Sequence, residues 1–229
     1  MRSNRKLILA GYDTAQDGLW TMSACRLTKA SQVQNFINVP GRYAPLDAST
    51  ALTDGQPYYG SANLYAYFES SEGDLEARQA RIDAMVNFLD GRSVEIIHPD
   101  HPGYYLVGRV QVAQDYNDLA HCAVTVNAVC DPWLYAAYQT EISLAAAAES
   151  KTAQLINAGR MAIVPTVTVD GDIHLTYGNT SWDLASGEYA LPELLLTPGT
   201  LYNQPAVHEV SYYGAGTITF TYREAVVAG

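Results

Sequence analysis

Two histidines and one aspartate lie within four consecutive positions, at His98, Asp100 and His101. Imidazole nitrogens and carboxylate oxygens bind zinc, and the same groups transfer protons in catalysis. A closed zinc site needs four ligands, and no third and fourth ligand follow at a suitable spacing. Pro99 and Pro102 also place the group in a turn. The sequence therefore favours a polar turn between two strands, with a metal hydrolase centred on the two histidines as a third-ranked hypothesis.

Three residues of the C-terminal half, His174, Tyr177 and Trp182, have side chains suited to sugar binding. Flat aromatic rings contact the apolar face of a pyranose, and a polar group nearby fixes its orientation. Such residues also fill the core of a β-sandwich or an assembly interface. Both interpretations are open at the level of sequence.

Motifs of the common enzyme classes do not occur in the necessary context. The sequence has no nucleophile elbow of the GxSxG type, no HExxH helix, no phosphate-binding loop and no dinucleotide-binding glycine pattern. We therefore expect a protein that is not an enzyme and that needs neither a cofactor nor a metal.

One amphipathic helix is predicted after Asp74, which is suited to cap its N-terminus, and before Gly91, which is suited to end it in a left-handed conformation. Its apolar residues recur at helical spacing and predict one buried stripe: Leu75, Ile82, Met85, Val86 and Leu89.

Short strands are predicted for most of the remaining chain, so the fold class is mainly β with one helix. Residues 40–59 combine many turn residues with few apolar ones, which predicts an extended arm or loop. In the C-terminal half, Asp170-Gly171 between two apolar runs predicts a hairpin turn. Regular spacing of short strands there is typical of a β-sandwich or jelly roll.

Composition places the chain among globular proteins: 229 residues, 48% hydrophobic and 16% charged. The formal net charge of -11 disfavours binding to a phosphate backbone but is compatible with a conduit through which DNA passes. No apolar run reaches the length of a membrane span. The three cysteines, Cys25, Cys122 and Cys130, favour folding in a reducing compartment with buried, inert thiols.

A family resemblance becomes visible when the segments are taken in order. The succession NVPGRYAPLDAST, YYGSANLYAYFES, MVNFLDGR, VEIIHPDHPGYYLVGRV and VNAVCDPWLYA resembles the distal tail (Dit) proteins of siphophages and related prophages. The segments NAGRMAIVPTVTVDGDIHLTYGN, YALPELLLTPG and GAGTITFTYREAVV resemble the galectin-like C-terminal domain of that family. The resemblance covers nearly the whole chain.

The resemblance implies a ring-forming, tail-tube-like N-terminal domain, residues 1–136, with a β-sandwich or barrel and a packed helix. It implies a galectin-like β-sandwich for residues 137–229. Such a protein is a structural hub at the virion tail tip, made in the bacterial host cytoplasm.

In the family, the hub forms a homo-hexameric ring with a central channel for DNA. The ring joins the tail tube protein to the tail-associated lysin or tail fibre and to receptor-binding proteins, without membrane insertion. In such a ring, Arg42, Arg109, His98 and His101 are candidates for contacts between subunits, although the two arginines also suit solvated strand edges. The alternative function is a carbohydrate-binding adsorption module that recognises host glycans through the C-terminal sandwich.

Overall fold

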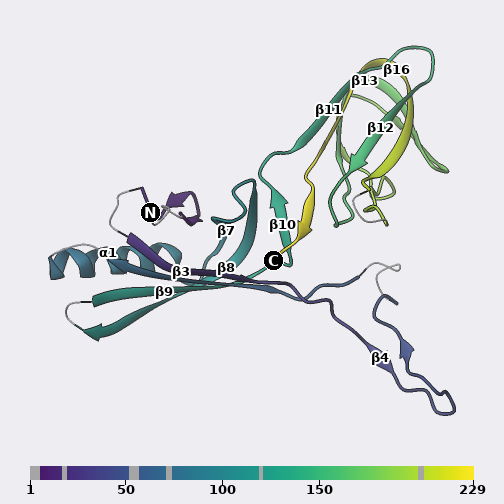
Figure 1. The fold of residues 1–229 in the computed structure, drawn as a ribbon. Helices are drawn as coiled ribbons and strands as arrows, with labels where there is room; N and C mark the ends of the chain where they lie inside the picture. Colours follow the sequence, from purple (N-terminus) through teal and green to yellow (C-terminus); the bar gives the residue numbers. More distant parts are fainter. Residues whose placement is uncertain (1–5, 17–19, 52–56, 71–73, 119–120, 201–203) are drawn as a thin grey trace. The chain divides into compact units, whose positions relative to one another are not determined.

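A computed structural model describes residues 6–16, 20–51, 57–70, 74–118, 121–200 and 204–229, without the side chains of 115–118 and 121–122. It contains two compact units (Figure 1). The first unit is Met1–Leu134 with Val227–Gly229, and the second unit is Tyr135–Val226. The last three residues thus cluster with the first unit. In the described residues one helix, α1 (Leu75–Leu89), accompanies the strands, so the predicted mainly β fold with one helix is confirmed.

The first unit is built on one antiparallel sheet with the strand order β2-β1-β7-β8-β9-β6-β3. Strands β10 and β17 pair with each other, and β10 also pairs with β8. The strands of this sheet are β1 (Ile8–Leu9), β2 (Tyr12–Asp13), β3 (Trp20–Thr28), β6 (Ala62–Ser70), β7 (Ser93–Ile97), β8 (Tyr104–Asp118), β9 (His121–Cys130), β10 (Trp133–Ala136) and β17 (Ala225–Val227). By the bounds above, β10 and β17 each contain residues of both units.

Alternation of apolar and polar residues sets which sheet face is buried. In β6 every second side chain is buried, and the residues between them are exposed or half-buried. The helix lies against β8, and it buries Ile82, Met85 and Leu89, each at most 6% exposed. Leu75 is 48% exposed, so its predicted burial is wrong. The first buried residue of α1 is Arg78, about one turn later, and the apolar part of its side chain extends the buried stripe.

Both ends of α1 follow the predicted chemistry. The Asp74 carboxylate accepts a hydrogen bond from the Ala77 amide at 2.9 Å. Gly91 has φ +74°, and its amide donates to the Val110 carbonyl at 2.8 Å, which ties the end of the helix to β8. The described part of the chain contains no helix that is long and apolar enough to cross a membrane.

A two-stranded ribbon extends from the first unit's sheet between β3 and β6 (Figure 1). It contains β4 (Phe36–Ile37) and β5 (Leu46–Asp47), which pair with each other in a sheet of their own. Its base is closed by two backbone hydrogen bonds, from Val33 to Tyr58 and from Gly60 to Ser31. We call residues 31–51 the arm.

In the described residues the strands of the second unit form one sheet, built around two long paired strands, β13 and β16. Each long strand has two shorter partners on its other edge: β14 and β15 pair with β13, and β11 and β12 pair with β16. The bounds are β11 (Thr140–Ala145), β12 (Lys151–Asn157), β13 (Thr166–Tyr177), β14 (Thr180–Leu184), β15 (Gly187–Ala190) and β16 (Ala206–Tyr222). One buried core includes residues of both long strands, among them Val167 and Leu175 of β13 and Val210 and Phe220 of β16.

The hairpin predicted at Asp170-Gly171 does not form, because β13 continues through these residues. Gly171, Gly214 and Gly216 have φ between +115° and +137°, and Gly171 lies opposite Gly216 across the pair. A Cβ atom on Gly216 would lie 1.7 Å from the Asp170 carbonyl oxygen. The glycines therefore allow the two long strands to bend and approach each other closely, and the turn signal marks a bend rather than a chain reversal.

Candidate functional site

The His98–His101 segment forms the tight turn that follows β7. The His101 amide donates to the His98 carbonyl at 2.9 Å, and the Asp100 amide donates to His98 Nδ1 at 3.2 Å. The two imidazole rings lie 5.7 Å apart, and His98 is only 3% exposed. In the described residues no group of three or more His, Cys, Asp or Glu side chains is placed to hold a metal ion. The histidine side chain thus stabilises the turn from inside the first unit.

The two arginines of the predicted interface lie in different environments. Arg109 in β8 is exposed, and its guanidinium donates to the Gly91 carbonyl at 2.6 Å. Arg42 is exposed in the arm, where its amide donates to the Val39 carbonyl. Arg109 pairs with Ser93 at the start of β7, whereas His98 follows the end of that strand. Of the four interface candidates, the structure therefore brings His98 and His101 together, and it does not group the two arginines with them.

The three sugar-site candidates lie on two opposite faces of the second unit's sheet. Trp182 is the cross-strand partner of Leu175, and Trp182 and Tyr177 pack against the buried core. Tyr177 Oη is 2.8 Å from His208 Nδ1 and donates to the Leu195 carbonyl, and burial raises the pKa of its phenol. His174, one position from Leu175, lies on the outer face. These three side chains do not form one platform.

The thiols behave as two classes. Burial, together with the nearby Asp131 carboxylate, raises the pKa of Cys130 to about 11. Its sulfur occupies the space beside Gly108, where a Cβ atom would lie 2.5 Å from Sγ. Cys25 is half-buried, and the Cys122 side chain lies outside the described residues. In Cys130 the thiol is therefore protonated at neutral pH and serves as a small core side chain.

Acidic residues of the first unit have local structural roles. The Asp13 carboxylate accepts hydrogen bonds from Lys6, at 3.0 Å, and from the Ala15 amide, which lower its pKa. Asp47 accepts from Ser49, which lowers its pKa, and Asp74 caps α1. Asp17, Asp54 and Glu72 lie outside the described residues. The carboxylates with known partners thus fix turns and a helix end.

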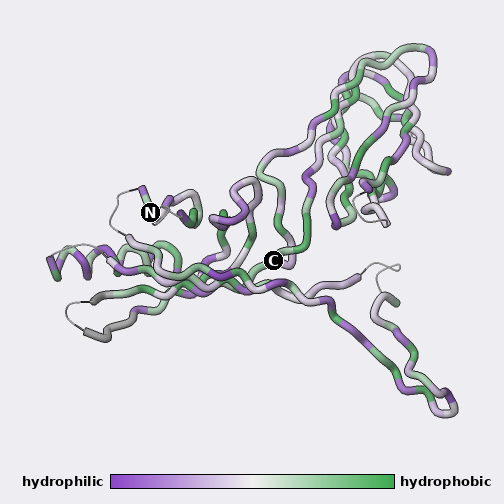
Figure 2. Tube along the Cα trace, in the orientation of Figure 1, coloured by the Kyte–Doolittle hydropathy of each residue, from purple (hydrophilic) through white to green (hydrophobic). Residues whose placement is uncertain are grey.

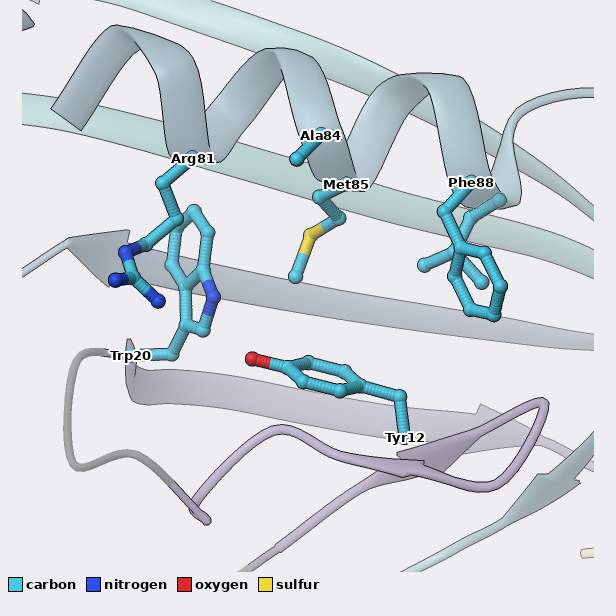
Figure 3. A pocket seen from close by; sticks show the side chains of 7 residues that line it. Tyr12, Trp20, Arg81, Ala84, Met85 and Phe88 are labelled. Atoms are coloured by element: carbon cyan, nitrogen blue, oxygen red, sulfur yellow. The ribbon is translucent and has the colours of Figure 1, made fainter. Parts of the chain in front are cut away.

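An apolar hollow of about 380 Å³ lies in the first unit under one face of α1 (Figure 3). Arg81, Ala84, Met85 and Phe88 extend from the helix toward Tyr12 and Trp20, and Leu89 completes the lining (Figure 3). It contains a single charged group, from Arg81, and no carboxylate or nucleophile, so its lining offers shape and apolar contact. It has no arrangement for acid–base chemistry.

The arm combines exposed large apolar side chains with the absence of buried residues from 31 to 47. Every residue from 31 to 47 is exposed, although several are large and hydrophobic. Hydrophobic segments alternate with polar ones along the ribbon (Figure 2). The large apolar side chains and their exposed fractions are Val33 43%, Phe36 56%, Ile37 46%, Val39 37%, Tyr43 111% and Leu46 42%. Large apolar side chains that are exposed together are a feature that interaction sites of proteins share.

The sequence predicts an arm but not its apolar character. Residues 40–59 stand out by their turn residues, whereas Val33, Phe36 and Ile37 precede that stretch. Asp183 and Tyr213, which adjoin His174 on the outer face, were also missed. Their grouping depends on strand register, for which a sequence carries no local signal.

Comparison with known proteins gives a likeness of fold. No family model matches the chain. No curated protein matches it in sequence either. Among solved structures, the chain is similar to the crystal structure of the Dit protein of phage SPP1, described as a paradigm of the hub adsorption apparatus of phages that infect Gram-positive bacteria. The two share 15% sequence identity with a TM-score of 0.62, over 96% of this chain and 98% of that one. The chain therefore has a Dit-like fold over nearly its whole length.

Proposed function

We propose that this chain is a structural protein of a phage tail tip, a hub that assembles from copies of itself and joins other tail proteins. The observation that carries the proposal is the exposed apolar arm on a chain whose whole fold is similar to that of a phage hub protein. The arm has no intramolecular partner layer among the described residues, so its apolar side chains are suited to contacts with other chains.

The proposed assembly is a ring of six copies. A contact between two different surfaces, repeated around an axis, closes into a ring without leaving either surface open at an end. The arm supplies one such surface, and each copy donates one arm and receives one. Arg42 lies within the arm and is retained as an interface residue, whereas His98 is excluded because it is buried in its own chain.

The proposed partners follow from the hub role. The ring joins the tail tube protein to the tail-associated lysin or tail fibre, and its central channel lets DNA pass without specific binding. In the proposed domain arrangement, residues 1–136 form the ring, and residues 137–229 form a galectin-like sandwich. The proposed location is the tail tip of the virion, of a phage or prophage, after synthesis in the host cytoplasm. The role requires no catalysis.

The test is the mass of the full-length protein in solution, by light scattering over a range of concentrations, together with electron micrographs of negatively stained particles. We expect ring-shaped particles of six copies, either alone or after addition of the tail tube protein and the tail-associated lysin of the same phage or prophage. A chain that remains monomeric under all of these conditions, and that binds neither partner, would overturn the proposal.

A further inference from the structure

One cross-strand row on the outer face of the second unit groups three side chains. His174 in β13 has Asp183 in β14 as its direct partner on one side and Tyr213 in β16 on the other. His174 Nδ1 lies 2.6 Å from Asp183 Oδ1, and the His174 and Tyr213 rings lie 4.8 Å apart with an angle of 30°. The imidazole is therefore held between a carboxylate and an aromatic ring.

A hollow of about 360 Å³ lies over this row. Its volume is within the range of small-ligand sites. Beside Tyr213, Gly214 has φ +137° at the bend of β16, and it leaves the wall without a side chain there. The lining is completed by Asp172, Ile173, Leu184 and Ala185.

The polar groups of the hollow have defined directions. A carboxylate only accepts hydrogen bonds, so the short contact places a proton on His174 Nδ1 and leaves Nε2 for another partner. Asp183 is 92% exposed, so its second oxygen is open to a hydroxyl donor. Tyr213 is 43% exposed and contributes a flat ring with a hydroxyl at its tip.

We propose that this hollow binds a neutral saccharide. A sugar ring presents hydroxyl groups, which pair with Asp183 and His174, and an apolar C–H face, which packs on Tyr213. Asp172 and Asp183 give the lining a negative charge, so sulfated, sialylated or phosphorylated glycans are repelled. The site goes beyond the proposed hub role and does not depend on ring formation, since all lining residues belong to the second unit.

The experiment uses the full-length protein on a printed array of neutral and anionic oligosaccharides, followed by calorimetry with the neutral sugars that bind. Tyr213→Ala removes the stacking surface, and Asp183→Asn removes the charged acceptor with little change in size. Loss of a charge-assisted hydrogen bond predicts roughly tenfold weaker binding or more for Asp183→Asn. Tyr213→Ala should weaken binding at least as much.

Matched controls come from the same unit. Tyr138→Ala removes an exposed tyrosine that does not line the hollow, and Glu188→Gln neutralises an exposed carboxylate elsewhere. Both controls should bind the neutral sugars as the unchanged protein does, with equal melting temperatures for all variants. The proposal is overturned if no neutral sugar binds at millimolar concentration, if only anionic glycans bind, or if Tyr213→Ala and Asp183→Asn bind as well as the controls.

Discussion

Removing the apolar side chains of the arm should abolish self-assembly and leave the fold intact. The informative variant changes Phe36, Ile37 and Leu46 to serine. Ile37 and Leu46 are cross-strand partners, and Phe36 lies beside them in β4. Since these side chains are 56%, 46% and 42% exposed, they contribute little to the core of an isolated chain.

The magnitude follows from the area that assembly would cover. Full burial of a large apolar side chain is worth about 1.5–3 kcal/mol, so covering the exposed half of each contributes about 1 kcal/mol. Three such side chains give about 3 kcal/mol for each contact between neighbours, which corresponds to roughly a hundredfold change in the association constant. Exposed substitutions usually change the free energy of unfolding by no more than about 0.5 kcal/mol.

The assay is sedimentation velocity over a concentration series, with a thermal melt of the same samples. Where assembly requires the tail tube protein, the measurement is the fraction of each variant that co-sediments with it. The matched control changes Ile156 and Val207 to serine, because these residues are also cross-strand partners, 42% and 53% exposed, but in the second unit.

Two results would refute the reasoning. Equal assembly of the arm variant and the unchanged protein would mean that the arm forms no contact between copies. A large loss of melting temperature in the arm variant alone, measured at a concentration where both proteins are monomeric, would mean that the arm packs against its own chain.

Three further predictions concern single residues. Asp74→Ala should reduce the free energy of unfolding by about 1 kcal/mol in a denaturant titration, because the Ala77 amide loses its acceptor, whereas Asn87→Ala on the exposed helix surface should have little effect. Gly216→Ala should unfold the second unit at room temperature, because its Cβ would clash with a backbone oxygen, whereas Gly178→Ala, at φ +57° in open space, should cost only about 1–2 kcal/mol. Cys130 should resist alkylation at pH 8 in the native protein, because the pKa of its thiol is raised to about 11. Half-buried Cys25 should react faster, and mass spectrometry measures both rates. The same shift favours the folded state below the ordinary thiol pKa, and this stability is lost as the pH rises toward about 11.

Residue patterns within short segments are sufficient to predict the helix and the mainly β fold class. Asp74 and Gly91 are read correctly because capping depends on residues a few positions apart. The same local reasoning fails at Asp170-Gly171. There the glycine allows β13 to approach Gly216 of β16, which lies opposite it across the strand pair and 45 positions away in the sequence. A positive φ is needed in both a turn and a bend, so the residue type alone does not distinguish them.

The candidate sites show the same limit. Trp182, Tyr177 and His174 look equivalent in sequence, but alternation along β13 and pairing with β14 place the first two against the core and the third outside. The guanidinium of Arg109 donates to a carbonyl of its own chain, which its position in the sequence does not indicate, and its role at an interface stays a prediction. The row of Asp183, His174 and Tyr213 joins three strands, and only the register brings it together.

Salt dependence separates the two kinds of interface that this chain could use. Each copy has a net charge of -11, so assembly brings like charges together, and added salt screens their repulsion. Apolar contacts made by the arm are not weakened by screening, so raising the salt from about 0.05 M to about 0.5 M should strengthen assembly. A ring held mainly by ion pairs of Arg42 or Arg109 would instead dissociate, because screening weakens exposed pairs. Sedimentation at both salt concentrations distinguishes these outcomes, and dissociation at high salt would contradict the assignment of the arm as the main contact.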